Sequence, residues 1–419
     1  MDLMRISKPG RSLGGAITLD GSKSLSNRAL IILALCGADP ADWLGHLSSA
    51  KDTNTLLDLL RHPADIYDAG DAGTTFRFLT AFLALQPGAQ VLTGSVRMRQ
   101  RPVGALVDAL RNLGAEIEYL ENPGYPPLRI GDPALIGSQG TTVRVDAGVS
   151  SQFLSALLLI GPYLPEGLRL LPEGRLVSRP YLDMTMRMMQ YFGAEALWEG
   201  QAIRVHPGRY TPRPLRIEAD WSAASYWYAL AALAGEAELE LHGLFPDSWQ
   251  GDAVLMRMME HFGVGTTATE AGIILHKSGA KAVPPFQWNF LECPDIAQTL
   301  AVLCAGLGTP GHFTGLETLA IKETDRTAAL ATELAKVGVT FEPAEASAGG
   351  GYRLGGKADW NAPPRFATYG DHRMAMAFAA LALLHPVEIE HPGVVAKSYP
   401  GFWDHLHAVG FTVQKTEAL

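Results

Sequence analysis

The pattern LVDALRNLGAEIEYL (106–120) recurs along the chain, next as MTMRMMQYFGAEALW (184–198). Each copy is an amphipathic run that ends in an apolar residue and Gly, and then continues as a short strand-like stretch. Three further copies are VLMRMMEHFGVGTTA (254–268), LATELAKVGVTF (330–341) and WDHLHAVGFTV (403–413). A glycine directly after a periodic helix is the expected left-handed cap. These segments therefore predict helices of one type, each with a polar face toward solvent.

A second pattern alternates with the first: a polar start rich in N-cap residues, followed by a helix that is apolar on nearly all faces. Its copies are SLSNRALIILAL (24–35), GTTFRFLTAFLAL (73–85), SSQFLSALLLIGPYL (150–164), WSAASYWYALAAL (221–233), PDIAQTLAVLCAGL (294–307) and YGDHRMAMAFAALALL (369–384). A helix that is apolar all round is buried. Short alternating stretches such as VRVD (143–146) and LRIE (215–218) precede several copies and favour strands. Each repeat is therefore predicted to be strands with one inner and one outer helix.

The repeats predict two pseudo-equivalent domains of three repeats each, although 419 residues alone would allow about three domains of ordinary size. A boundary just before Asp220 gives a first domain over 22–218 and a second domain made of 1–21 plus 219–419. The region from Arg61 to Ala69 lacks part of the pattern, so we expect one degenerate repeat in the first domain.

Composition excludes several classes of protein. Charged residues are 18% and hydrophobic residues 47%, which is globular rather than disordered. A net charge of −9 without a Lys/Arg tract argues against nucleic acid as a partner. The three cysteines have no metal-ligand spacing, which predicts no structural zinc and a reducing compartment. Apolar runs shorter than about 18 residues predict no membrane span, and the N-terminus lacks the apolar core of a signal peptide. We therefore expect a cytoplasmic protein.

The starts of the inner helices are candidate anion sites, because helix N-termini present free N–H groups and partial positive charge. Cations cluster beside them: Lys23, Arg28, Arg77, Arg97, Arg99, Arg101, Lys322, Arg326, Arg373 and Lys397. A single N-cap or a single arginine is usually structural. The whole set favours a ligand with several anionic groups, for which arginine is suited. GSKS (21–24) lacks the glycine that precedes the lysine of a P-loop, which disfavours nucleotide hydrolysis.

Two acids, Asp295 and Glu323, lie among these cations. A carboxylate in such a place can simply neutralise its neighbours. It can also transfer protons to and from a bound substrate. The residues by themselves leave both interpretations open.

Eight motifs in order carry a resemblance to a known family. They are GSKSLSNRAL (21–30), DAGTTFR (71–77), RMRQRPVGALVDALRNLGA (97–115), SSQFLSALL (150–158), SRPYLD (178–183), KETDR (322–326), GDHRMAM (370–376) and AKSYPGFW (396–403). The chain closely resembles the family of 5-enolpyruvylshikimate-3-phosphate (EPSP) synthases. The resemblance implies an α/β fold, a two-domain inside-out α/β barrel in which each domain holds three βαβαββ units, with the active site in the cleft between the domains.

The resemblance implies transfer of the carboxyvinyl group of phosphoenolpyruvate to the 5-hydroxyl of shikimate 3-phosphate, with release of phosphate. This addition and elimination belongs to the shikimate pathway to chorismate and aromatic amino acids. Asp295 and Glu323 are then the proton-transfer groups and Lys23 is a catalytic and binding cation. Neither a metal nor an organic cofactor is implied, and we expect a monomer whose partners are the two small-molecule substrates.

Carried over position by position, the family's binding residues form two sets that share Lys23 and Gln152. Shikimate 3-phosphate is expected to contact Lys23, Ser24, Arg28, Ser150, Ser151, Gln152, Ser178, Tyr181, Asp295 and Lys322. Phosphoenolpyruvate is expected to contact Lys23, Gly73, Arg97, Gln152, Arg326, Arg373 and Lys397.

The sequence also departs from the family pattern. Asp71 stands where the family has Asn, Phe78 where it usually has Pro, and Thr318 and Ala320 where it often has Asn and Arg. The alternative is the sister enzyme that adds enolpyruvate to UDP-N-acetylglucosamine on the same fold. That family typically carries a reactive Cys near VRMRQRP (96–102), and no Cys occurs there.

Overall fold

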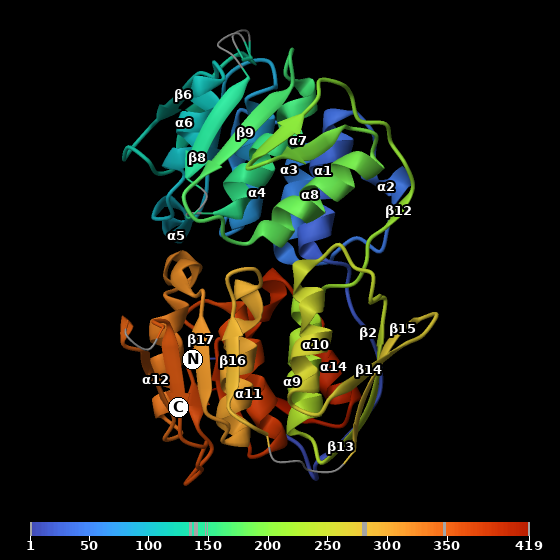
Figure 1. The fold of residues 1–419 in the computed structure, drawn as a ribbon, viewed down its shortest axis with the longest axis vertical. Coiled ribbons are helices and arrows are strands. Elements are labelled where there is room, and N and C mark those ends of the chain that lie inside the picture. Colours follow the sequence, from blue (N-terminus) through green and yellow to red (C-terminus); the bar gives the residue numbers. More distant parts are fainter. Residues whose placement is uncertain are drawn as a thin grey trace. The chain divides into compact units, whose positions relative to one another are not determined.

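The chain forms two compact units in the computed structural model, which describes residues 2–133, 136–137, 141–146, 148, 150–278, 283–346 and 349–417. The first unit is Gly21–Ile217, and the second unit joins Met1–Asp20 to Glu218–Leu419. The chain therefore begins in the second unit, builds the whole first unit, and then returns (Figure 1).

One repeat of the first unit shows the βαβαββ order most fully. It runs β8 (Thr142–Asp146), α7 (Ser151–Ile160), β9 (Leu168–Glu173), α8 (Arg179–Tyr191), β10 (Ala196–Glu199) and β11 (Ala202–Val205). β8 and β9 pair in parallel across the α7 crossover, and the β10–β11 hairpin adds antiparallel to β9. The resulting sheet has the order β10-β11-β9-β8.

The other two repeats of the first unit differ in size. One has β4 (Ile66–Asp68), α4 (Gly73–Leu83), β5 (Gln90–Thr93), the short α5 (Val96–Arg99), α6 (Gly104–Asn112), β6 (Ile117–Tyr119) and β7 (Leu128–Ile130). The other has α1 (Lys23–Leu35), α2 (Pro40–Trp43), β3 (Leu44–Gly45), α3 (Lys51–Arg61) and β12 (Leu215–Arg216). Among the described residues its sheet contains only β12 and β3, so the expected degenerate repeat is confirmed.

The second unit has three four-stranded sheets, ordered β14-β15-β13-β2, β16-β17-β19-β18 and β20-β21-β1-β22. The first repeat uses β2 (Ser12–Thr18), α9 (Trp221–Leu233), β13 (Glu236–His242), α10 (Leu255–Glu260), β14 (Gly265–Ala268) and β15 (Gly272–Ser278). The next uses β16 (Phe286–Asn289), α11 (Ala297–Leu307), β17 (Gly311–Thr314), α12 (Arg326–Ala335), β18 (Thr340–Pro343) and β19 (Tyr352–Gly355). The last uses β20 (Arg365–Phe366), α13 (His372–Ala379), β21 (Val387–Glu390), α14 (Phe402–Ala408), β22 (Thr412–Glu417) and β1 (Asp2–Ser7).

Short 3-10 turns precede helices of the second unit. η4 (Pro294–Ile296) leads into the inner helix α11. The turns η3 (Gly251–Val254), η5 (Glu317–Ile321) and η8 (Pro392–Lys397) precede the outer helices α10, α12 and α14. In each repeat of this unit a comparable 3-10 turn therefore precedes the outer helix.

The inner helices of each unit pack on one another. In the first unit α1, α4 and α7 are in mutual contact, and in the second unit α11 contacts both α9 and α13; Figure 1 shows α9 beside α11. Of the 13 residues of α9, 12 are buried. The outer helix α10 buries only Leu255, Met258 and Met259. The predicted division into inner and outer helices is confirmed.

Local signals in the sequence begin and end these helices. The side chains of Ser22, Ser150, Asp220 and Asp371 accept hydrogen bonds from first-turn N–H groups of α1, α7, α9 and α13. The five glycines that end the outer-helix pattern have φ values from 75° to 97°: Gly114, Gly193, Gly263, Gly338 and Gly410. The left-handed caps predicted from the sequence are confirmed.

Within the described part of the chain, no helix combines the length and the apolar character needed to cross a membrane.

Candidate active site

The N-termini of the three inner helices of the first unit meet at one end of that unit. Lys23 at the start of α1 forms an ion pair with Asp52 of α3, with Nζ 3.0 Å from Oδ2. Thr75 of α4 donates a hydrogen bond to the carbonyl of Asp52 at 2.9 Å. Gln152 of α7 donates through Nε2 to Thr74 Oγ1 at 3.1 Å. The starts of α1, α4 and α7 are therefore linked through Lys23, Asp52, Thr74, Thr75 and Gln152, and we call these residues together with Arg28 the first-unit cluster.

Arg28 is buried within the first-unit cluster, with only 2% of its surface exposed. Its Nε donates to Thr185 Oγ1 at 2.7 Å, Nη2 to Ser155 Oγ at 3.1 Å and Nη1 to the Ser24 carbonyl at 3.0 Å. Burial lowers the pKa of Arg28 to about 10. Arg28 thus joins α1, α7 and α8 in addition to its predicted contact with shikimate 3-phosphate.

Two further predicted residues lie at the start of α8. Tyr181 places its ring 6.0 Å from the guanidinium carbon of Arg28, and its carbonyl accepts a hydrogen bond from Arg28 Nη2. Ser178 precedes α8 with a left-handed backbone, φ 55°. Tyr181 thereby contacts the first-unit cluster through Arg28, and Ser178 lies in the turn that begins α8.

Arg101 is the arginine that the structure brings to Gly73, whereas Arg97 is exposed on α5. A Cβ built on Gly73 would lie 2.6 Å from Nη1 of Arg101, so a side chain at the start of α4 would displace the Arg101 guanidinium. Arg101 is 7% exposed, and its Nε has no hydrogen-bond partner among the described residues. A buried donor of this kind beside a helix N-terminus suits an anion.

Arg101 follows the end of α5 (Val96–Arg99), whereas Arg97 lies within that helix, and the motif that contains both does not show which of them is buried. Arg77 supports the same segment, because Nη1 donates to the Gly73 carbonyl and Nη2 to the Pro102 carbonyl, each at 3.1 Å. Arg77 thus fixes the start of α4 against the residue that follows Arg101.

The second unit gathers the other predicted residues around Arg326. This side chain is 2% exposed and contacts three carboxylates. Nε donates to Asp371 Oδ2 at 2.7 Å, Nη2 to Glu323 Oε2 at 2.9 Å and Nη1 to Asp295 Oδ1 at 3.2 Å. Burial alone would lower the pKa of Arg326, but these three carboxylates raise it above its ordinary value.

Asp295 is held between three cations. Arg373 Nη2 lies 2.9 Å from Oδ2, while Arg326 Nη1 and Lys322 Nζ lie 3.2 Å and 3.6 Å from Oδ1. Burial by itself would raise the pKa of Asp295, but the charges of Arg373, Lys322 and Arg326 outweigh it and hold the pKa well below the usual value. Asp295 is therefore ionised at neutral pH.

Glu323 connects Arg326 to the last predicted cation, with Lys397 Nζ 3.7 Å from Oε1. Asp371 was not among the predicted site residues, although it has no exposed side-chain surface and both caps α13 and pairs with Arg326. Its place two residues before Arg373, at a helix start, was the available signal. The second-unit cluster therefore comprises Asp295, Lys322, Glu323, Arg326, Asp371, Arg373 and Lys397.

The two clusters suit anion binding and proton transfer. The second-unit cluster has four cations, each within 4.0 Å of a carboxylate, and an anionic substrate would compete for those cations. In the described part of the chain, no group of three or more His, Cys, Asp or Glu side chains is arranged to hold a metal ion.

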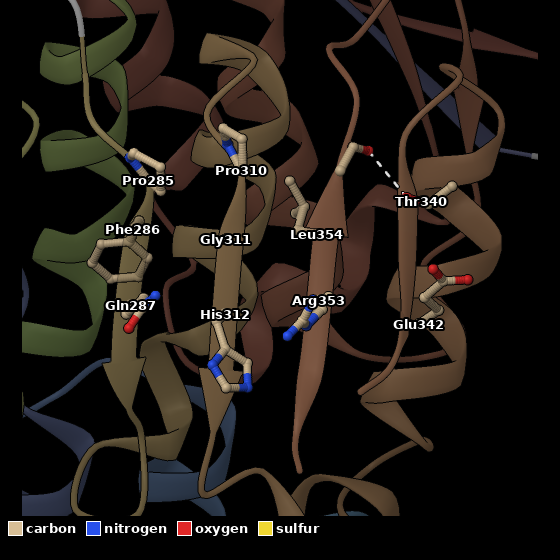
Figure 2. Close-up of a pocket in the computed structure, with 11 residues that line it drawn as sticks. Pro285, Phe286, Gln287, Pro310, Gly311, His312, Thr340, Glu342, Arg353 and Leu354 are labelled. Carbon is tan, nitrogen blue, oxygen red and sulfur yellow. Dashed lines mark hydrogen bonds between the residues drawn. The ribbon is translucent and has the colours of Figure 1, made fainter. Parts of the chain in front are cut away.

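A separate depression lies on the sheet of β16, β17, β19 and β18 (Figure 2). Figure 2 shows Gln287, His312, Arg353 and Glu342 on four adjacent strands, and none of the residues that line the depression belongs to either cluster. It contains none of the predicted site residues, so we do not assign the reaction to it.

The fold and the two clusters define an α/β protein built to bind phosphorylated or carboxylated small molecules. The family model described as EPSP synthase (3-phosphoshikimate 1-carboxyvinyltransferase) matches residues 60–406. The chain is 47% identical over 405 residues to a 3-phosphoshikimate 1-carboxyvinyltransferase of Bacteroides fragilis (strain YCH46), covering 96% of each chain. It is 36% identical to the same enzyme of Cellvibrio japonicus, covering 94% of this chain and 97% of that one. The chain belongs to the EPSP synthase family.

The fold agrees with this assignment. The structure of EPSP synthase from Acinetobacter baumannii superimposes with a TM-score of 0.78 at 22% identity, covering all of both chains. The expected two-domain inside-out α/β fold is thereby confirmed.

Proposed function

We propose that this chain transfers the carboxyvinyl group of phosphoenolpyruvate to the 5-hydroxyl of shikimate 3-phosphate, with release of phosphate. As a member of the EPSP synthase family it is a transferase of the shikimate pathway to aromatic amino acids. The observation that carries the proposal is the second-unit cluster, in which Asp295 and Glu323 both bind the buried Arg326. The family and its relatives favour this reaction over transfer to UDP-N-acetylglucosamine.

Both clusters contribute to substrate binding in this proposal. Phosphoenolpyruvate is bound by Lys23, Gly73, Gln152, Arg326, Arg373 and Lys397. We assign Arg101 rather than Arg97 to it, because Arg101 lies against Gly73 with a buried Nε that has no partner among the described residues. Shikimate 3-phosphate is bound by Lys23, Ser24, Arg28, Ser150, Ser151, Gln152, Ser178, Tyr181, Asp295 and Lys322.

The proton steps follow from the charges. In the addition step the 5-hydroxyl attacks C2 of phosphoenolpyruvate and loses its proton, while the methylene carbon gains one. Asp295 is kept ionised by its three cationic neighbours before the substrates bind, and it accepts the hydroxyl proton once those cations turn toward the substrates' anionic groups and its basicity rises. Glu323 and Lys23 exchange the methylene proton. In the elimination step the methyl group returns a proton as the phosphate leaves, which restores the double bond.

Arg373 and Lys322, which pair with Asp295, become available to the substrate as Asp295 takes up its proton. A neutral Asp295 no longer attracts Arg373 and Lys322, so these groups can turn fully to the substrate's anionic oxygens. Proton transfer and charge stabilisation are therefore coupled through the same ion pairs.

The test is release of inorganic phosphate from purified protein supplied with shikimate 3-phosphate and phosphoenolpyruvate. We expect saturable turnover that requires both substrates. Turnover with UDP-N-acetylglucosamine in place of shikimate 3-phosphate, or none with either, would overturn the proposal.

We also propose that the chain acts as a monomer in the cytoplasm, without nucleic acid. Its net charge of −9 and three unpaired cysteines support this. Light scattering coupled to size-exclusion chromatography measures the mass, for which we expect 45.0 kDa. Twice that mass would contradict a monomer.

A further inference from the structure

Asp252 of η3 is a buried carboxyl group that the fold does not explain. It is 4% exposed, and its Oδ2 accepts a hydrogen bond from Ser222 Oγ at the start of α9. Its Oδ1 is buried and has no hydrogen-bond partner among the described residues. A buried oxygen without a donor is costly, which favours a role for Asp252 in the neighbouring second-unit cluster.

Asp252 and two residues of the second-unit cluster lie near the corresponding turns of their repeats. η3, η5 and η8 each precede the outer helix of a repeat. Lys397 is the last residue of η8, Glu323 follows η5 by two residues, and Asp252 lies within η3. Each of the three repeats therefore contributes a charged residue in or close to the turn that precedes its outer helix: Asp252, Glu323 and Lys397.

The groups that face Asp252 come from several elements. Asp295 beside α11 and Asp220 at the cap of α9 repel its charge, Arg373 of α13 attracts it, and the Ser222 hydroxyl stabilises it. Asp252 also faces the buried thiol of Cys293. Burial and then Asp295 outweigh the favourable contacts and raise the pKa of Asp252 to about 7.

The protonation of Asp252 changes the charge that a substrate meets. The second-unit cluster has four cations, Lys322, Arg326, Arg373 and Lys397, against the three carboxylates of Asp295, Glu323 and Asp371. A protonated Asp252 preserves that single excess positive charge, whereas an ionised Asp252 cancels it. An anionic substrate binds better to the first state.

We propose that Asp252 is a positioning residue of the anion site, which by holding a proton keeps the second-unit cluster cationic for phosphoenolpyruvate. This proposal rests on the proposed function. Binding of phosphoenolpyruvate is then accompanied by proton uptake at Asp252, and its KM rises as Asp252 ionises.

The experiment measures KM and kcat for phosphoenolpyruvate from pH 6 to 9 with saturating shikimate 3-phosphate. In the wild type we expect KM to rise about tenfold, the scale of one added charge nearby, with a smaller change in kcat. Asp252→Asn removes that rise. Ser222→Ala deletes the hydroxyl donor that favours the ionised form of Asp252, so the midpoint of the rise in KM moves to higher pH. Asp247→Asn makes the same chemical change at an exposed position five residues earlier and keeps the wild-type profile.

The titration of phosphoenolpyruvate itself is common to all four proteins, so the difference between profiles isolates Asp252. Identical profiles for wild type and Asp252→Asn overturn the role of Asp252 while the turnover itself supports the function. No turnover in the wild type overturns the proposed function instead. If Asp252→Asn fails to fold, an unshifted midpoint in Ser222→Ala overturns the proposal.

Discussion

Arg326 shows how one side chain can define the chemistry of its surroundings. Its guanidinium uses Nε, Nη1 and Nη2 to contact Asp371, Asp295 and Glu323, which come from three different segments of the chain. A planar group with five donors can hold these carboxylates in fixed directions, which the point charge of a lysine cannot. The two proposed proton carriers are thereby kept near each other.

The first prediction concerns those carriers. Glu323→Gln and Asp295→Asn should each lower kcat by about 10²-fold or more, because an amide cannot take up the transferred proton. Steady-state phosphate release measures the effect. Glu317→Gln, at an exposed position of η5, is the matched control and should retain wild-type kcat. Near-normal kcat in both Glu323→Gln and Asp295→Asn would leave these acids with a neutralising role only.

The second prediction separates Arg101 from Arg97. Arg101→Ala should raise KM for phosphoenolpyruvate by roughly 30-fold or more, since a charge-assisted hydrogen bond in a buried site contributes about 2 kcal/mol. Arg97→Ala should change KM by less than about threefold, as expected for an exposed charge. The reverse order of effects would support the assignment made from the sequence alone.

Individual residues also show which parts of the candidate site could not be predicted from the sequence. The motifs identified Asp295, Glu323, Arg326, Arg373 and Lys397, which the structure brings into one cluster. Asp52, Asp371 and Asp252 were missed because a carboxylate's partner depends on tertiary packing. Arg97 lies within α5 and Arg101 just after it, and the motif does not report which of the two the tertiary packing buries.

At the scale of elements, helix ends were the most predictable features. Ser150, Asp220 and the capping glycines act through their own backbone neighbours, so the signal is local. The pairing of strands is not local. β2 pairs with β13 more than two hundred residues later in the chain, and no turn between them specifies that register.

The third prediction tests the capping glycines. Gly338 has φ 75°, and a Cβ there would meet no atom within 4 Å, so Gly338→Ala costs only backbone strain. We expect a loss of about 1 to 2 kcal/mol in the free energy of unfolding. Urea unfolding followed by circular dichroism measures it. Gly208→Ala, equally open but without a positive φ, should be neutral or slightly stabilising. Equal effects of the two substitutions would contradict a left-handed cap.

At the scale of the whole molecule, the proposed function divides each substrate's contacts between two units. The fourth prediction is therefore that shikimate 3-phosphate and phosphoenolpyruvate together reduce the radius of gyration, because ligands that bridge two bodies restrict them. Small-angle X-ray scattering with both ligands, each ligand alone and neither gives the comparison. Superimposable curves in all four conditions would contradict the bridging of the units.

The return of the chain to its second unit has a consequence for synthesis on the ribosome. β1 and β2 are translated before the first unit, yet β13, β21 and β22, with which they pair, are translated only after the entire first unit. The first unit can fold while translation continues. Until then β1 and β2 lack their partner strands, and unpaired strands of this kind are prone to pair with other chains. Translation of the second unit therefore starts before that of the first unit, but the second unit can be completed only after it.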